Sequence, residues 1–275
     1  MKCRLIICGL SLAVALVVCA MAPHTCHAAS VDSAGVWSAS MGRTVPVTVI
    51  APDAGKSHPT VYLLHGYGGN HNTWLLKTCP ALPSLADSLG IIFVCPDGRN
   101  SWYIDSPVDT ASCYETFITH ELVAFVDSAY ATVPHRHARA ICGYSMGGHG
   151  ALWCSLRHSG VWRAAYCISG CVDLTAYPGR WEIDRVLGAY AGHQAQWRAH
   201  SVVNLDAAAA GVDISLDCGS EDVFVNDNRR LHRRLSALGV PHRYTEMPGG
   251  HTHDYWRAAL MRALDYLSPL LQRED

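Results

Sequence analysis

Strand-like and helix-like segments alternate along most of the 275-residue chain. Two segments with alternating apolar and polar positions, 36–40 and 45–50, predict a β-hairpin. Further strands are predicted at residues 60–64, 91–95, 138–142, 164–169, 213–217 and 242–246. Helices are predicted at residues 82–89, 115–130, 151–157, 228–238 and 253–271, while residues 171–204 have no regular pattern and many aromatic side chains. This alternation predicts a single α/β domain, in which helices cover both faces of a mostly parallel sheet.

The first residues have the pattern of an export signal. Lys2 and Arg4 form a basic start, residues 5–20 are apolar, and small residues at 26–28 offer a cleavage site. We therefore expect a leader at residues 1–29 and a mature domain at 30–275, free in the periplasm or outside the cell. A lipid anchor on Cys19 is the alternative, which the bulky residue before it disfavours. No later apolar stretch is long enough to predict a membrane span.

Charge excludes some classes of partner. Removing Lys2 and Arg4 with the leader reduces the 21 basic residues to 19 against 23 acidic residues, a net charge of −4. A surface of this charge argues against binding nucleic acid or an anionic membrane. The composition, with 49% hydrophobic and 16% charged residues, fits one large globular domain.

The positions of the cysteines are more typical of residues packed in the core than of metal ligands or redox-active thiols. Eight of the 12 cysteines follow the leader, and export would permit disulfides. Cys95, Cys142, Cys167 and Cys218 lie in or at the ends of predicted buried strands, where a free thiol packs as a small apolar group. No C-x-x-C pair occurs, so we expect neither a metal site nor a cofactor.

The segment Gly143-Tyr144-Ser145-Met146-Gly147 carries the most specific chemical signal. It lies between a predicted strand and a predicted helix, where G-x-S-x-G forms a sharp nucleophile elbow. We expect Ser145 to be the nucleophile and the Met146 N–H group to stabilise an oxyanion. The alternative interpretation is a glycine-rich turn that contains an incidental serine.

Serine needs a base to become a nucleophile, and His251 is the favoured candidate. It follows two glycines in the loop between the last predicted strand and the last predicted helix. His253, two residues further on, is the alternative, although we expect it in the first turn of that helix.

Asp222 is the favoured acid for orienting this base. It lies in the loop that follows the predicted strand 213–217. Asp217, Glu221 and Asp173 remain as alternatives, because each is near the end of a predicted strand and a solvated loop carboxylate would need no role.

The loop after strand 60–64 should supply the second oxyanion donor, which we assign to the Tyr67 N–H group. His65 and the neighbouring glycines are expected to shape this loop. Residues 96–103 follow another strand end, so Asp97 or Arg99 could contact substrate or could form a structural turn.

Aromatic residues in the loops could bind the substrate or pack in the core. We expect Trp102 and Trp181 to contact substrate, and the segment 171–204 to form a lid over the site. The other aromatic residues considered for stacking on a sugar or a feruloyl ring are Trp74, Tyr177 and Trp197.

Four motifs together resemble the esterase D group of α/β-hydrolases. They are residues 64–69 (Leu-His-Gly-Tyr-Gly-Gly), 143–148, 218–222 and 249–251 with Tyr255-Trp256. The group includes S-formylglutathione hydrolases, short-chain acyl esterases, feruloyl and acetylxylan esterases of carbohydrate esterase family 1, and mycolyltransferases. The resemblance covers residues 36–271 and implies the triad and oxyanion donors named above. His253 departs from it, since similar secreted esterases often have tryptophan there.

The resemblance and the leader together imply an exported serine carboxylesterase. Its expected substrates are small-molecule or carbohydrate esters with short acyl or hydroxycinnamoyl groups. A thioesterase similar to S-formylglutathione hydrolase, or an acyltransferase, is the alternative. A binding protein that has lost catalysis is disfavoured, because every triad and donor position is filled.

Overall fold

The computed structural model describes residues 29–52, 55–207 and 211–272, so residues 1–28 of the expected leader lie outside the described residues. Eight strands form one sheet: β1 (Ser30–Ser38), β2 (Arg43–Ala51), β3 (Thr60–Leu64), β4 (Ile92–Pro96), β5 (Arg139–Tyr144), β6 (Ala164–Ile168), β7 (Asp213–Gly219) and β8 (His242–Met247). Their order in the sheet is β1-β2-β4-β3-β5-β6-β7-β8. Strand β2 is antiparallel to both of its neighbours, β1 and β4, and all other neighbouring strands are parallel. This is the doubly wound sheet of an α/β-hydrolase.

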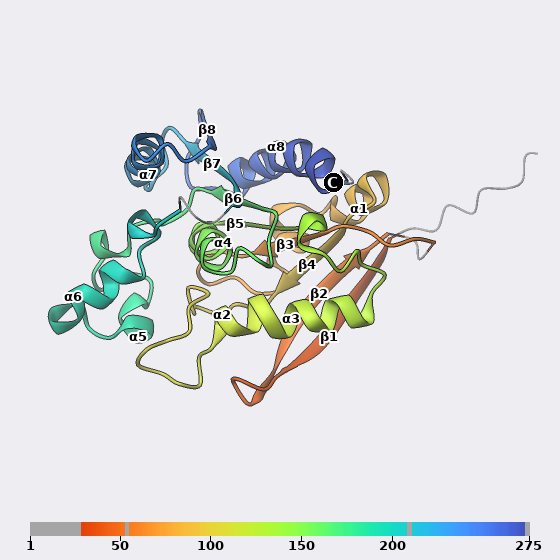
Figure 1. Ribbon diagram of the computed structural model, residues 1–275, viewed down its shortest axis with the longest axis horizontal. Helices are drawn as coiled ribbons and strands as arrows, with labels where there is room; N and C mark the ends of the chain where they lie inside the picture. The colour runs from red at the N-terminus through yellow and green to blue at the C-terminus, as the bar shows by residue number, and fades with distance from the viewer. Residues whose placement is uncertain (1–28, 53–54, 208–210, 273–275) are drawn as a thin grey trace, which may run out of the picture.

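Helices cover both faces of the sheet. The α-helices are α1 (Leu82–Leu89), α2 (Tyr114–Thr116), α3 (Leu122–Ala129), α4 (Met146–Arg157), α5 (Ile183–Leu187), α6 (Tyr190–Ala199), α7 (Val225–Ala237) and α8 (His253–Leu271). Single π or 3₁₀ turns occur at Trp74–Thr78, Phe117–Glu121, Arg136–Ala138, Leu174–Ala176 and Val202–Asn204. Helices α1 and α8 cover one face, while α3 and α4 cover the other (Figure 1). A separate apolar core fills the space on each face.

The register of the parallel strands brings their carboxyl ends to one edge. Leu64 of β3 pairs with Gly143 of β5, and Ile168 of β6 pairs with Tyr144 and Asp217 on its two neighbours. Loops that follow these strands therefore meet at the same edge, where parallel sheets carry their functional groups.

Most of the predicted elements are confirmed, and the differences have local causes. The strand 60–64 and the helices 82–89 and 253–271 have the predicted bounds, and Gly90 ends α1 in the left-handed conformation (φ 62°). Helix α4 begins five residues before the predicted residue 151. Its first turns contain three glycines, whose low helix propensity hid them from the pattern. The segment 171–204 is not irregular throughout, because it contains α5 and α6.

The eight cysteines of the described residues are all free thiols. Seven are buried and Cys113 is partly exposed, so the expectation that Cys95, Cys142, Cys167 and Cys218 pack as apolar groups is confirmed. Burial raises the pKa of each of these four thiols, which keeps them protonated. Across the described part of the chain, no helix has the length and apolarity that a membrane crossing needs.

Candidate active site

Ser145 occupies a strained turn between β5 and α4. Its φ of 58° and ψ of −119° lie outside the regions that residues with a side chain usually adopt. Glycines on both sides allow the turn, because a Cβ on Gly143 would lie 2.2 Å from the Gly147 carbonyl oxygen. A Cβ on Gly147 would lie equally close, 2.2 Å, to the Leu64 carbonyl oxygen. The predicted nucleophile elbow is therefore present in the backbone.

Ser145, His251 and Asp222 form a continuous line of hydrogen bonds. His251 Nε2 lies 2.9 Å from Ser145 Oγ, and His251 Nδ1 lies 2.9 Å from Asp222 Oδ2 and 3.1 Å from Asp222 Oδ1. The Asp222 side chain is buried, while His251 keeps some contact with solvent. The acid loop and the histidine loop are joined, because the Glu221 N–H group donates to the Gly249 carbonyl at 3.0 Å. The structure thus brings together three residues that lie 29 and 106 positions apart.

The alternative acids have other partners. Asp217 is fully buried in β7 and accepts hydrogen bonds from Arg262 and two tyrosines. Asp173 pairs with Arg230 and accepts the Thr175 N–H group at 3.0 Å, so it begins a 3₁₀ turn. Glu221 is exposed to solvent. None of the three carries the hydrogen bond to His251.

His253, the alternative base, is the first residue of α8, as expected. Its Nδ1 atom lies 2.9 Å from Thr78 Oγ1, and its ring packs edge-on against Tyr144 and Trp256. It lines the same cavity as Ser145, so its place is in the wall of the site.

The loop after β3 lies against the elbow. A Cβ on Gly66 would lie 3.2 Å from Ser145 Cβ, and Tyr67 lines the Ser145 cavity. Met146 is the first residue of α4, where helical N–H groups have no partner within the helix. Both predicted oxyanion donors are therefore on segments that border Ser145.

His65 shapes this loop, as predicted. It is fully buried, and its Nε2 atom accepts the Gly98 N–H group at 2.9 Å. The proton of the ring is therefore on Nδ1, which donates to the Gly66 carbonyl at 2.7 Å.

A cavity of about 310 Å³ opens beside Ser145. Aromatic rings form much of its wall, namely those of Tyr67, Tyr144, Trp181 and Trp256. Lys77 and His253 add polar groups to the lining. Tyr144 and Trp256 are stacked with ring centroids 4.0 Å apart. The sequence reasoning missed Tyr144 and Lys77, although Tyr144 is within the elbow motif itself.

The predicted substrate contacts are only partly supported by position. Trp181 lines the Ser145 cavity. Trp102 does not, since it is 1% exposed and its Nε1 atom donates to the Trp181 carbonyl at 3.1 Å. Asp97 does not line the Ser145 cavity either, and its carboxylate accepts the Arg99 N–H group at 2.9 Å. Neither Trp102 nor Asp97 lines the Ser145 cavity, and both hold loops around it, so a contact of either with substrate stays a prediction.

The expected lid segment contributes Trp181 to the lining of the Ser145 cavity. Trp181 and Tyr177 each pack against Phe224, which in turn contacts the His251 ring edge-on at 5.1 Å. Trp197 and Trp74 are fully buried, so neither offers a face to substrate. Within the described residues, no group of three or more His, Cys, Asp or Glu side chains could hold a metal ion.

A doubly wound sheet with a strained serine elbow and a hydrogen-bonded Ser-His-Asp line defines a serine hydrolase of the α/β-hydrolase fold. The family model "Putative esterase" matches residues 38–267, and the chain belongs to this esterase family. It is therefore an enzyme that acts on ester bonds.

Relatives in sequence and structure agree with this family. The chain is 28% identical over 226 residues to an acetyl esterase of Caldicellulosiruptor saccharolyticus, which covers 76% of the chain and 83% of the relative. It is 24% identical over 224 residues to the S-formylglutathione hydrolase of Bos taurus, covering 72% and 77%. A solved ferulic acid esterase superposes with a TM-score of 0.76 at 25% identity, covering 89% of the chain and 99% of that structure.

Proposed function

We propose that the protein is an exported serine carboxylesterase that cleaves short acyl or hydroxycinnamoyl esters, with carbohydrates as the alcohol part. The observation that carries the proposal is the hydrogen-bonded line from Ser145 through His251 to Asp222. In this proposal Ser145 is the nucleophile, His251 is the general base and Asp222 holds the imidazole in place.

The first half of the reaction forms an acyl-enzyme. Ser145 Oγ attacks the ester carbonyl carbon while its proton passes to His251 Nε2 over the 2.9 Å contact. The negative charge that develops on the carbonyl oxygen is stabilised by the N–H groups of Tyr67 and Met146. When the carbon–oxygen bond breaks, the leaving alcohol takes the proton from His251.

The second half repeats this sequence with water. His251 removes a proton from the water as it attacks the acyl carbon, and Ser145 Oγ leaves with that proton. Asp222 remains ionised throughout and stabilises the imidazolium each time it forms. Free acid and free enzyme result.

The lining of the Ser145 cavity is suited to substrates with small acyl groups or flat aromatic acyl groups. Trp181 and the exposed Tyr67 offer ring surface to a hydroxycinnamoyl group or a sugar, while the stacked Tyr144 and Trp256 form the buried part of the wall. Relatives named acetyl esterase and ferulic acid esterase fit the same two acyl classes. A thioester substrate is the second candidate, because relatives named S-formylglutathione hydrolase match 72% of the chain or more.

Serine-to-alanine substitution tests the catalytic proposal. Ser145→Ala should lower kcat on p-nitrophenyl acetate by a factor on the order of 10⁴ or more, since only binding and oxyanion stabilisation remain. Circular dichroism and thermal unfolding should show an intact fold. Near-normal turnover by the folded variant would reject the mechanism. A panel of feruloyl and acetyl sugar esters beside S-formylglutathione separates the two substrate candidates.

Export is tested on the mature protein. The basic start, the apolar run and the small residues at 26–28 support cleavage that leaves a chain beginning near Ala29. Amino-terminal sequencing of the protein recovered outside the cytoplasm checks this expectation. An intact Met1, or a lipid attached to Cys19, would contradict it.

A further inference from the structure

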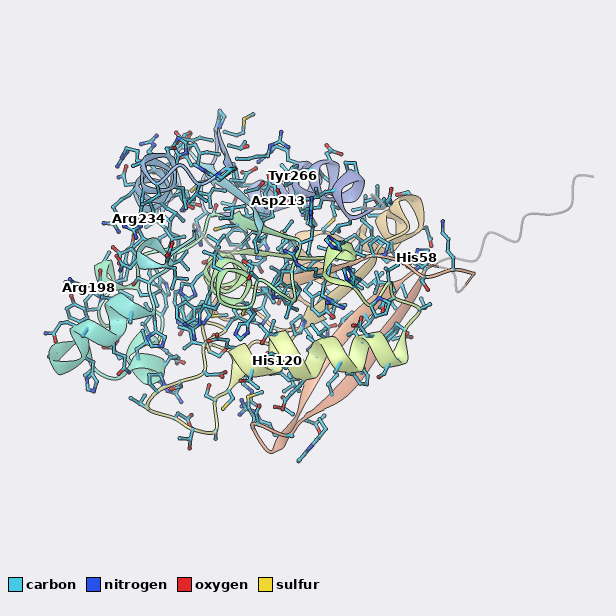
Figure 2. All side chains as sticks on the ribbon, in the orientation of Figure 1. His58, His120, Arg198, Asp213, Arg234 and Tyr266 are labelled. Carbon is cyan, nitrogen blue, oxygen red and sulfur yellow. The ribbon has the colours of Figure 1, made fainter. Side chains whose placement is uncertain are left out.

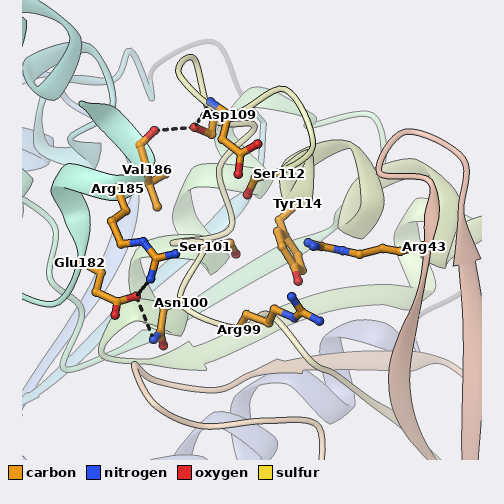
Figure 3. A pocket seen from close by; sticks show the side chains of 11 residues that line it. Arg43, Arg99, Asn100, Ser101, Asp109, Ser112, Tyr114, Glu182, Arg185 and Val186 are labelled. Atoms are coloured by element: carbon orange, nitrogen blue, oxygen red, sulfur yellow. Dashed lines mark hydrogen bonds and ion pairs between the residues drawn. The ribbon is translucent and has the colours of Figure 1, made fainter.

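A second cavity, of about 290 Å³, lies near the Ser145 cavity, and among the described residues the two share no lining residue. The start of β2, the loop after β4, residues 106–114 and α5 enclose it (Figure 3). Its charged residues are three arginines and two carboxylates: Arg43, Arg99, Arg185, Asp109 and Glu182. The proposed acyl transfer uses none of these side chains.

Hydrogen bonds within the protein already occupy the two carboxylates. Glu182 Oε2 accepts from Arg185 Nη1 at 3.2 Å and from Asn100 Nδ2 at 3.3 Å. Asp109 Oδ1 accepts the Ala111 N–H group at 3.1 Å and is exposed on the side of the cavity away from Arg99 (Figure 3). The lining has three positive and two negative side chains, a net charge of +1. Arg185 and Glu182 offset one another, so Arg43 and Arg99 supply the positive charge on the side away from Asp109.

These two arginines converge on Tyr114 (Figure 3). The guanidinium carbon of Arg43 lies 5.3 Å from the centroid of the Tyr114 ring, and Arg43 Nε is buried with no hydrogen-bond partner among the described residues. Arg99 has a left-handed backbone (φ 44°), which the Asp97 carboxylate holds through the Arg99 N–H group. The residue with the strained backbone, Arg99, is therefore the one whose guanidinium group points toward the Tyr114 phenol.

Tyr114 is a hydrogen-bond donor at neutral pH. Burial raises the pKa of its phenol, and the positive charges of Arg43 and Arg99 offset this rise only in part. Two guanidinium groups and one phenol thus meet in a cavity with room for a ligand. All three groups donate hydrogen bonds, and two of them are positively charged.

A carboxylate is the ligand that matches this set. Guanidinium groups bind carboxylates through paired hydrogen bonds, and a phenol O–H adds a third donor. A phosphate would bring a second negative charge into a cavity that already holds Asp109 and Glu182. The other oxygens of those two carboxylates, Asp109 Oδ2 and Glu182 Oε1, and Ser112 instead suit the hydroxyl groups of a sugar.

Asn100 connects the two cavities. Its Oδ1 atom accepts the Gly68 N–H group at 2.9 Å, next to the proposed oxyanion donor Tyr67, and its Nδ2 atom donates to Glu182. Trp181 lines the Ser145 cavity, and the next residue, Glu182, lines the second. The two cavities are therefore neighbours across the wall that Asn100, Trp181 and Glu182 form, and the subsite requires the alcohol part of the substrate to extend across this wall.

We propose that Arg43, Arg99 and Tyr114 form a subsite for a carboxylate on the alcohol or thiol part of the ester substrate. This subsite rests on the proposed esterase function of Ser145. Two sources share the chemistry: a uronic acid in an acylated oligosaccharide, and a carboxyl group of a thiol peptide such as glutathione.

The test compares substrates that differ in one carboxylate. Acetylated methyl glucuronoside is compared with acetylated methyl glucoside, which has a hydroxymethyl group in place of the carboxylate. For the wild type, kcat/KM should favour the acid. Arg99→Gln should reduce the ratio of the two kcat/KM values about tenfold or more, because hydrogen bonds to charged groups are among the strong ones. Tyr114→Phe should reduce it less.

A matched control removes the same charge elsewhere. Arg198 is exposed on α6 at the outer edge of the molecule (Figure 2). Arg198→Gln should keep the wild-type ratio, which separates a subsite from the general field of the protein. Thermal unfolding of Arg99→Gln, whose side chain is exposed, checks that the fold is intact.

The outcomes distinguish the two proposals. An unchanged ratio for both substrate pairs, in both Arg99→Gln and Tyr114→Phe, would overturn the subsite, while Ser145-dependent cleavage of p-nitrophenyl acetate would leave the esterase proposal standing. Absence of that cleavage in the wild type would overturn both. S-acetylglutathione against its diethyl ester, in which the carboxyl groups are masked, forms the second arm. A loss in Arg99→Gln confined to this pair supports the subsite and identifies the peptide carboxyl group as the source.

Discussion

Two buried carboxylates near the end of β7 have almost the same exposure and different surroundings. Asp217 is 0% exposed and Asp222 is 4% exposed. Arg262 donates to Asp217 through Nε and Nη2 at 2.8 and 2.9 Å, and the hydroxyl groups of Tyr166 and Tyr255 donate at 3.0 and 2.6 Å. Asp222 instead faces His251 and accepts the Phe224 N–H group at 2.9 Å.

The hydrogen-bond partner, and not the extent of burial, separates the structural carboxylate of Asp217 from Asp222, the proposed catalytic acid. Arg262 is always charged, and its hydrogen bonds to Asp217 raise its pKa further. Burial and Asp217 together raise the pKa of both phenols, so the tyrosines remain donors. The Asp217 network has the same charges at every stage of the reaction. His251 gains and loses a proton in the proposed cycle, so only Asp222 meets a charge that changes.

The largest expected effect is on turnover, at Asp222. Asp222→Asn should lower kcat by about 10⁴, because the amide neither stabilises the imidazolium nor holds the productive tautomer of His251. Its unfolding midpoint in urea should remain close to that of the wild type. Steady-state kinetics with p-nitrophenyl acetate measures the first quantity. If Asp217→Asn or Asp173→Asn proved the more damaging to kcat, Asp222 would not be the catalytic acid.

Asp217→Asn should have the opposite effect: it should lower the stability of the fold much more than it lowers kcat. Breaking a buried ion pair leaves Arg262 without its counter-charge, and we expect about 3 kcal/mol less free energy of unfolding. Arg262 is partly exposed, which keeps the loss from being larger. Urea denaturation gives this value, and kcat per folded molecule should fall far less than in Asp222→Asn. A stable Asp217→Asn protein with no activity would contradict the structural role.

The smallest effect is expected from one hydroxyl group of the same network. Tyr166→Phe removes a single donor at 3.0 Å from Asp217 and keeps the ring in place. The free energy of unfolding should fall by about 1 to 2 kcal/mol, the cost of one hydrogen bond to a charged group. Tyr266→Phe, on α8 outside this network, is the matched control. Equal losses in the two variants would show that Asp217 does not depend on Tyr166.

The order of elements and the serine turn could be predicted because both are encoded locally. Apolar periodicity fixes strands and helices over a few residues, and the glycines of the elbow are required by contacts within the turn and with β3. His251 was accessible for a similar reason, since its place between the last strand and the last helix follows from that order. Helix α4 began earlier than predicted, because glycines required for close packing are poor helix formers.

Other features depended on which segments meet in space. The sequence by itself determined an α/β-hydrolase fold, the serine at its elbow and the histidine that follows its last strand. It left four carboxylates as candidates for the acid, and only the joined loops after β7 and β8 placed Asp222 against His251. Tertiary packing likewise buried Trp102, left Trp181 in the cavity wall and gathered Arg43 and Arg99 around Tyr114. Side-chain partners are set by contacts between distant segments, and no local pattern records these contacts.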